Sequence, residues 1–298
     1  MMFTDNTRGK SIAKDPAVVH FHGKYFLYYT TCPQEENSLP WGIGISQSEN
    51  MEDWTKVTDM EYVGELEASG ICAPGALVYD GKVHLFYQTY GRFAEDAICH
   101  AWSEDGIHFT RNKTNPIIRA KGSWNNGRAI DADVCIFNGE LFLYYATRDP
   151  QGNIQMQAVS KCPLDGKFER TSWQQCCSDS ILKPELPWEQ ECIEAAATIV
   201  RNNKVYMFYA GAYNNSPQQI GVAVSEDGVH FKRLWEDPFL PNGKSGSWNE
   251  SESGHPYIFE DDDSRIYLFF QGNNDDGKSW YLSKLEIGFR DELPYIIT

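Results

Sequence analysis

The stretch AKDPAVVHFHGKYFLYYTT (residues 13–31) joins an acidic residue before proline, a His-Gly turn and an aromatic run that recurs along the chain. Runs of aromatic and β-branched residues are typical of β-strands. Five runs share this pattern and begin about 60 residues apart. They are KYFLYYTT from residue 24, KVHLFYQT from 82, ELFLYYAT from 140, KVYMFYAG from 204 and RIYLFFQG from 265. The chain is therefore built from five copies of one unit.

Short polar turns precede the five aromatic runs, at 22–23, 80–81, 138–139, 202–203 and 261–264. Asx-Gly pairs between apolar runs indicate β-hairpins. A further strand and turn follow each run, as in SEDGIHF (103–109) and SEDGVHF (225–231), which we interpret as structural outer hairpins. Four-stranded units cannot bury both faces alone, but they can when arranged around an axis. The sequence predicts an all-β fold, a single five-bladed β-propeller over residues 1–298, with a β-sandwich or β-helix as alternatives.

The composition limits the partners of this 298-residue chain. It has 26 Lys and Arg against 42 Asp and Glu, a net charge of −16, which disfavours nucleic acid and anionic membranes. Aromatic residues make up 14% of the chain and suit stacking on sugar rings. No apolar run is long enough to span a bilayer, and no apolar leader is visible, so we expect a cytoplasmic protein, or a periplasmic or secreted one if a leader has been removed. The eight cysteines are irregularly spaced, which favours reduced thiols. The oligomeric state is not indicated.

Ionisable residues stand at equivalent positions of the repeats. We expect the aromatic strand to lie nearest the axis, so that the residues ahead of it face a shared channel mouth. Counting back nine residues from the starts of the first three runs gives Asp15, Ala73 and Asp131. Counting back ten from the last two, for one extra turn residue, gives Glu194 and His255. Three carboxylates in so small a space repel one another, which should raise the pKa of at least one.

Glycosidic bond hydrolysis is the chemistry that needs such a set of carboxylates. One must be ionised, to activate water or attack the sugar, and another must be protonated, to donate to the leaving oxygen. A third can orient the acid and hold up its pKa. The pattern of Asp15, Asp131 and Glu194 therefore favours a glycoside hydrolase.

On these residues the chain resembles glycoside hydrolase family 43, five-bladed propellers, over nearly its whole length. The resemblance implies that Asp15, in KDPAVV, is the general base. It implies that Asp131, in AIDADV, tunes the acid and positions substrate, although Ala132 replaces the family's proline. Glu194, in IEAAATIV, matches the general acid. His255 matches a channel histidine that lies near a water-bound calcium in some members.

The resemblance implies an enzyme that removes a terminal pentose, α-L-arabinofuranose or β-D-xylose, from plant-derived oligosaccharides with inversion. Polar inserts at 32–40 and 178–191 favour a pocket and hence exo action. No cofactor is required, and a structural Ca²⁺ in the central channel, held through water at His255, is an expectation. Cys72-Ala73-Pro74 lacks the tryptophan of the family's blade-two motif. Related clans therefore remain alternatives: β-fructosidase-like or anhydrogalactosidase-like enzymes, a glycoside phosphorylase, or a non-catalytic sugar-binding propeller.

Each catalytic candidate has an alternative interpretation. Asp15 before proline is also a common start of a turn. Asp133 lies on the same strand face as Asp131, two residues on, and Glu191 competes with Glu194. His255 could be a hydrogen-bonded core histidine. The acidic run at 261–263 lacks the spacing of an EF-hand and is interpreted as a hairpin turn.

The remaining substrate-binding candidates are aromatic or basic. Trp41 follows a polar loop that we place at the rim of the site, and Trp124 and Trp248 end two GSW motifs, as packing residues or sugar platforms. Arg128 is a cation near the acid, and Arg290 is a candidate for the arginine that family members direct at the substrate from a late strand.

Overall fold

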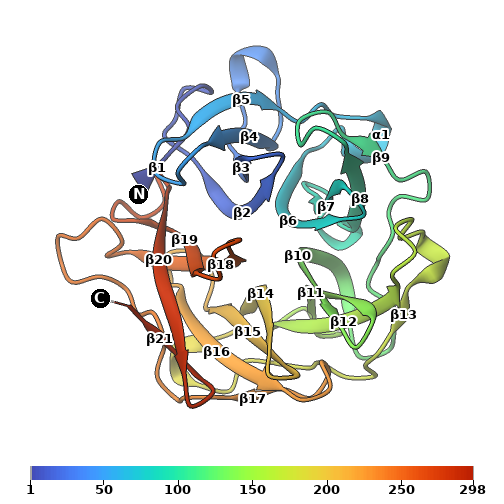
Figure 1. Ribbon diagram of the computed structural model, residues 1–298, viewed down its shortest axis with the longest axis vertical. Helices are drawn as coiled ribbons and strands as arrows, with labels where there is room; N and C mark the ends of the chain where they lie inside the picture. The colour runs from blue at the N-terminus through green and yellow to red at the C-terminus, as the bar shows by residue number, and fades with distance from the viewer. Residues whose placement is uncertain (1, 298) are drawn as a thin grey trace.

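Each aromatic run forms the second strand of an antiparallel sheet, and five such sheets surround a central axis (Figure 1). The computed structural model describes residues 2–297. The first blade contains β2 (Lys14–Phe21), β3 (Lys24–Thr31), β4 (Gly42–Ser48) and β5 (Thr55–Asp59). The second contains β6 (Ile71–Tyr79), β7 (Lys82–Thr89), β8 (Ile98–Ser103) and β9 (Thr110–Arg111). The third blade contains β10 (Asn126–Phe137), β11 (Glu140–Arg148), β12 (Gln155–Pro163) and β13 (Gln174–Gln175). The fourth contains β14 (Ile193–Arg201), β15 (Lys204–Gly211), β16 (Gln219–Ser225) and β17 (Lys232–Arg233).

The fifth blade is completed by both ends of the chain. It contains β18 (Glu252–Glu260), β19 (Ile266–Asn273) and β20 (Tyr281–Arg290). Near the N-terminus, β1 (Met2–Phe3) pairs with one half of β20, and near the C-terminus β21 (Leu293–Ile296) pairs with the other half. Figure 1 shows both ends of the chain beside this blade. The pairing of β1 with β20 joins the first and last parts of the ring, so the five-bladed propeller predicted from the repeats is confirmed.

Helices are confined to single turns between strands. They are α1 (Gly64–Glu67), η1 (Glu35–Asn37), η2 (Phe93–Glu95), η3 (Arg170–Ser172) and η4 (Pro187–Glu189). No helix among residues 2–297 is long and apolar enough to cross a membrane. All eight cysteines are free thiols, as expected from their spacing.

One expectation about the strands is wrong. The aromatic strands do not lie nearest the axis; that place belongs to β2, β6, β10, β14 and β18, which meet around the centre in Figure 1. The polar turns ahead of the aromatic runs are the hairpins that join each innermost strand to its neighbour, and the acidic turn at 261–263 is one of them. The innermost strands carry short side chains where space is smallest, as in CAPGA and EAAAT.

The aromatic strands supply the packing between blades. Their largest fully buried side chains include Tyr28, Tyr87, Tyr144 and Phe208. The hydroxyl of Tyr28 donates to the carbonyl of Gly106 at 2.9 Å, inside the SEDG turn of the next blade, and Tyr144 donates to Gly228 in the second SEDG turn at 2.9 Å. The structural interpretation of these turns is confirmed, because their backbone carbonyls accept hydrogen bonds from buried tyrosine hydroxyls of the preceding blade.

Candidate active site

A β-bulge recurs at the same place in every innermost strand. In each blade one extra residue of that strand is inserted opposite the second strand. The residues at the bulge have left-handed backbones, although none is glycine: Asp15 (φ 51°), Ala73 (45°), Asp131 (53°), Ala195 (51°) and His255 (41°). Such a conformation costs about 1–3 kcal/mol per residue and is concentrated at functional sites. The bulge redirects the chain at the axis and aims these side chains at one place.

Glu194 does not occupy the position that the sequence comparison gave it. It precedes the bulge and has the place of Lys14 in the ladder with the second strand, whereas Ala195 is the equivalent of Asp15. The allowance for an extra turn residue was wrong here, because the turn at 202–203 has two residues, as in the first three blades. Glu194 still reaches the shared pocket, as Lys14 does from the first blade.

Side chains from the preceding blade hold most of the bulges in place. The seventh residue of an aromatic run accepts a hydrogen bond from the bulge N–H of the following blade in three cases: Thr30 from Ala73 (2.8 Å), Gln88 from Asp131 (2.7 Å) and Gln271 from Asp15 (2.9 Å). These bonds couple the position of each axial residue to its neighbouring blade.

Blades three and four depart from this pattern and surround Glu194 with amides. Their seventh residues are Ala146 and Ala210, too short to reach a neighbour. Gln155 and Gln218 donate instead to the two carboxylate oxygens of Glu194, Gln218 at 2.7 Å. Neither glutamine was identified from the sequence. The signal was the alanine at the seventh position of the third and fourth aromatic runs, because alanine cannot accept the hydrogen bond that Thr30, Gln88 and Gln271 accept.

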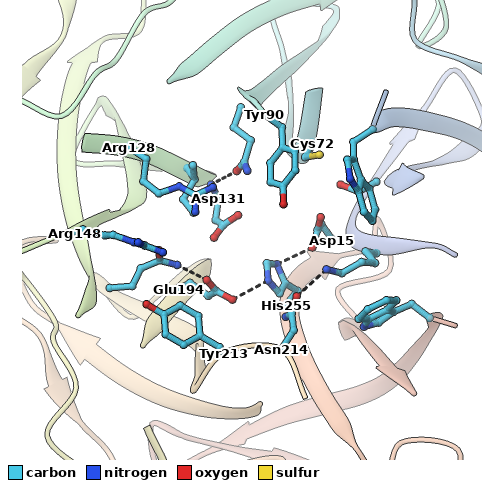
Figure 2. Close-up of a pocket in the computed structure, with 17 residues that line it drawn as sticks. Asp15, Cys72, Tyr90, Arg128, Asp131, Arg148, Glu194, Tyr213, Asn214 and His255 are labelled. Atoms are coloured by element: carbon cyan, nitrogen blue, oxygen red, sulfur yellow. Dashed lines mark hydrogen bonds and ion pairs between the residues drawn. The ribbon is translucent and has the colours of Figure 1, made fainter. Parts of the chain in front are cut away.

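The four axial candidates lie in one pocket of about 360 Å³ (Figure 2). Asp15, Asp131, Glu194 and His255 are each less than 10% exposed. His255 lies between two carboxylates: its Nδ1 is 2.9 Å from Asp15 Oδ1, and its Nε2 is 3.2 Å from Glu194 Oε1. Polar atoms of Asp131, Glu194 and His255 lie within 4.8 Å of one another.

Two cations keep Asp15 ionised. Burial opposes its charge, but His255 and Lys14 outweigh burial and hold the pKa of Asp15 below its usual value. The pKa of His255 is raised well above its ordinary value in return, because the charge of Asp15 and the bonds to Asp15 and Glu194 overcome the effect of burial. At neutral pH His255 is therefore an imidazolium between two carboxylates.

The other two carboxylates behave differently from each other. Burial, together with the charges of Glu194 and Asp15, raises the pKa of Asp131 to about 7. Burial opposes the charge of Glu194 as well, but the bonds from His255 and Gln218 and the charge of His255 lower its pKa. The expectation that at least one carboxylate has a raised pKa is confirmed. Of these two carboxylates, Asp131 therefore keeps a proton to higher pH than Glu194 does.

A family model supplies the identification. The model described as "Glycosyl hydrolases family 43" matches residues 6–285. This protein belongs to glycosyl hydrolase family 43. The match covers all five innermost strands, so the axial carboxylates lie within the family's own region.

Individual relatives are distant. The chain is 23% identical over 172 residues to a β-xylosidase of Xylanibacter ruminicola, covering 55% of this chain and 51% of the relative. It is 27% identical to xylosidase/arabinosidase 43A of Humicola insolens (48% and 43% covered) and to a β-1,2-mannobiose phosphorylase of Thermoanaerobacter sp. strain X514 (38% and 40%). The matches span about half or less of these relatives. A solved thermostable family-43 glycoside hydrolase superposes with a TM-score of 0.80 at 20% identity, covering 99% of this chain and 96% of that one. At this identity the likeness shows the fold.

The residues around His255 are those that would hold the expected Ca²⁺ through water. One carboxylate oxygen each of Asp131 and Glu194 and a ring nitrogen of His255 lie within 4.8 Å of one another. The narrow channel below the pocket encloses about 20 Å³ and is lined by Asp15, Asp131 and Asp133 beside prolines and alanines. Carboxylate oxygens and water are ligands that Ca²⁺ prefers.

Two of the five further binding candidates line the pocket, and three do not. Trp41 and Arg128 line it. Trp124 packs against an apolar cluster of blades two and three, and Trp248 packs on Phe270 with ring centroids 5.5 Å apart. Arg290 is exposed at the far end of β20, over the ring of Tyr295, because β20 is the third strand from the axis. Placing these three in the binding site was wrong.

The structure also shows where Asp133 and Glu191 lie, the two alternatives to Asp131 and Glu194. Asp133 is buried deeper in the channel, where the N–H and hydroxyl of Thr198 donate to it at 2.8 and 2.5 Å, and burial raises its pKa to about 7. Glu191 is exposed and does not line the pocket. Neither is positioned with Asp15 and His255 as Asp131 and Glu194 are.

Several residues of the pocket wall were not identified from the sequence. They come from strand ends and loops whose approach depends on the closed ring: Lys14, Tyr90, Arg148, Tyr213, Asn214 and Trp280. The insert at 32–40 ends beside the pocket at Trp41, whereas no residue of the insert at 178–191 lines it.

Proposed function

We propose that this family-43 protein is an exo-acting glycoside hydrolase that removes a terminal pentose, α-L-arabinofuranose or β-D-xylose, from plant-derived oligosaccharides with inversion. The observation that carries the proposal is the meeting of Asp15, Asp131 and Glu194 in one pocket, with an ionised carboxylate and a protonated one side by side. The xylosidase and arabinosidase names of the matched relatives support a pentose.

In this proposal Asp15 is the general base. Its lowered pKa keeps it ionised, so it accepts a proton from the attacking water over a wide pH range. His255 and Lys14 hold that charge in place. The ring of His255 stands between Asp15 and Glu194, and this spacing supports inversion, since retaining enzymes need their two carboxyl groups about 5–5.5 Å apart.

Glu194 donates the proton to the leaving oxygen, and Asp131 holds that proton in the resting site. Asp131 and Glu194 have polar atoms within 4.8 Å of each other, a distance over which one bound water can pass a proton. Once the leaving oxygen is bound beside Glu194, a proton that passes from Asp131 to Glu194 becomes available for donation. The amides of Gln155 and Gln218 keep the Glu194 carboxylate at a fixed place for this transfer.

A pH profile tests this assignment of protons. Activity requires the pair to retain one proton, so kcat/KM should fall as the pH rises through about 7, the pKa of Asp131. No fall should appear on the acid side until the pH is below the ordinary carboxyl range, because Asp15 stays ionised there. An acid-side loss near pH 6 would contradict the role of Asp15.

The activity itself is tested with nitrophenyl α-L-arabinofuranoside, β-D-xyloside and galactoside. We expect turnover of a pentoside by the wild-type protein and loss of about 10²–10⁴-fold in Asp15→Asn, the range for removing a general base. Because Asp15 acts on water, the loss should be similar for good and poor leaving groups. Asp262→Asn, a change in an exposed hairpin turn, is the matched control and should retain full activity. Full turnover by Asp15→Asn would exclude the base role.

A further inference from the structure

Two arginines in the pocket wall have almost no partners. Arg128 makes a single contact, from Nη2 to Asp96 Oδ2 at 3.5 Å, and its Nε is buried without a hydrogen-bond partner among residues 2–297. Arg148 makes a single contact within the same described range, from Nε to Gln155 Oε1 at 3.5 Å. A guanidinium carries five N–H donors, so most donors of both side chains are unused.

Three other arginines, one buried and two half-buried, show what a structural role looks like. Arg8 donates five bonds of 2.8–3.3 Å to Asp59, Tyr62 and two backbone carbonyls. Arg111 and Arg233 each form paired bonds to one buried glutamate and donate to a carbonyl as well. Arg201 also has an unpartnered Nε, but it pairs with Glu260 at 2.9 Å and does not line the pocket. Arg128 and Arg148 lack such acceptors and line the pocket, which indicates that their acceptor is a ligand.

Both arginines stand on the same side of the pocket. Arg148 ends β11 and pairs with Asn126 at the start of β10, two residues before Arg128. Figure 2 shows their side chains flanking Asp131 and Glu194, opposite Asp15. The side of the proposed acid is where the leaving part of the substrate lies, because the base activates water from the other face of the sugar.

We propose that Arg128 and Arg148 form an anion-binding subsite for the carboxylate of a uronic acid in the leaving part of the substrate. The inference rests on the proposed function for the direction of the substrate. A planar carboxylate accepts two parallel N–H bonds from one guanidinium, which both arginines can offer. A phosphate is the other oxyanion with this chemistry, and inorganic phosphate is therefore a separate arm of the test.

Three sugars that differ only at C5 test the subsite. D-Xylose has hydrogen there, D-glucose a neutral hydroxymethyl group and D-glucuronate a carboxylate, and their binding can be measured by calorimetry. We expect glucuronate to bind about tenfold more tightly than glucose or xylose at low salt, a difference of one decade in Kd. The preference should shrink as salt is added, because the contact is between charges.

Substitutions of Arg128 and Arg148 test whether these residues cause the preference for glucuronate. Arg148→Gln and Arg128→Gln should each reduce the preference for glucuronate to about threefold or less, since charge-assisted bonds are about twice as strong as neutral ones. Arg148→Lys should retain part of it, because lysine keeps the charge but not the two parallel donors. Arg265→Gln, at an exposed turn, is the control and should bind all three sugars as the wild type does. Equal binding of the three sugars, or a preference that persists in both glutamine variants, would overturn the subsite.

The outcome is separable from that of the proposed hydrolase. Hydrolysis of nitrophenyl pentosides without a glucuronate preference would overturn the subsite alone. A glucuronate preference with no hydrolysis of any pentoside would support the subsite and overturn the hydrolase. Inorganic phosphate is the third arm: release of a sugar 1-phosphate would assign the arginines to phosphate and overturn the uronate proposal.

Discussion

Two sets of buried carboxylates occur in this propeller, and their surroundings differ. Three of them, which we call the clamp carboxylates, lie away from the axis in blades one, two and four. Each accepts a hydrogen bond from a tyrosine of the second strand and another from a cation of the fourth strand. The sets are Asp5 with Tyr29 and Lys56, Glu67 with Tyr87 and Arg111, and Glu189 with Tyr209 and Arg233.

The axial carboxylates Asp15, Asp131 and Glu194 are buried to a similar degree. Asp15 and Glu194 share one imidazolium, and Glu194 also accepts hydrogen bonds from Gln155 and Gln218. Asp131 Oδ2, by contrast, has no hydrogen-bond partner among the described residues. A buried charge without full pairing is costly, so the protein retains a proton on Asp131. The comparison teaches that a saturated carboxylate fixes the fold, whereas an unsaturated one at a bulge remains available for proton transfer.

Glu194→Gln is expected to give the largest effect. Removing a general acid lowers activity by about 10²–10⁴-fold on substrates with poor leaving groups. Substrates with strongly activated aryl leaving groups need no proton, so their turnover should fall much less. Rates on natural oligosaccharide and on dinitrophenyl pentoside measure the difference. An equal loss on both kinds of substrate would remove Glu194 from the acid role.

Glu189→Gln, five residues earlier, should leave catalysis intact but weaken the fold. It removes the charge that Arg233 pairs with, and breaking a buried ion pair costs about 3–5 kcal/mol. Urea unfolding measures this loss, and activity per folded molecule should be unchanged. Glu185→Gln is the matched control, because Glu185 pairs with the same Arg233 from an exposed position and should contribute less than about 1 kcal/mol. If the two variants were equally stable, the clamps would not stabilise the fold.

Asp133→Asn should have the smallest effect on activity and should change only the pH dependence of stability. Burial raises the pKa of Asp133 to about 7, so the folded protein keeps a proton that the unfolded chain releases near its ordinary pKa of 3.8. Between these values the wild type loses stability relative to the variant by about 1.4 kcal/mol per pH unit, and above pH 7 the difference is constant. Unfolding curves from pH 5 to pH 8 test this, and a flat difference would contradict the raised pKa.

The sequence predicted the fold because the repeats record the local geometry of each blade. The spacing of the aromatic runs and their turns indicated five antiparallel units, and the positions ahead of them led to Asp15, Asp131 and His255. Glu194 was identified through a count that was wrong by one residue. That error did not matter because the residue before the bulge and the bulge residue both face the pocket.

Other features could not be predicted because they depend on contacts between blades. Trp124, Trp248 and Arg290 have suitable chemistry but lie in packing or at the outer surface. Nothing in the sequence singled out Arg148 or Gln155. Arg148 stands out because few acceptors surround it, and Gln155 stands out because it donates a hydrogen bond to Glu194.

The sequence by itself determined the number of blades and which blades carry a carboxylate at the axis, because hydrophobic pattern and turn chemistry act within about 60 residues of chain. Only the closed ring decided the charges of those groups. It brings His255 between Asp15 and Glu194, residues far apart in the chain, and it removes them from water. Burial and charge pairing act through space, and they separate the ionised base from the protonated Asp131.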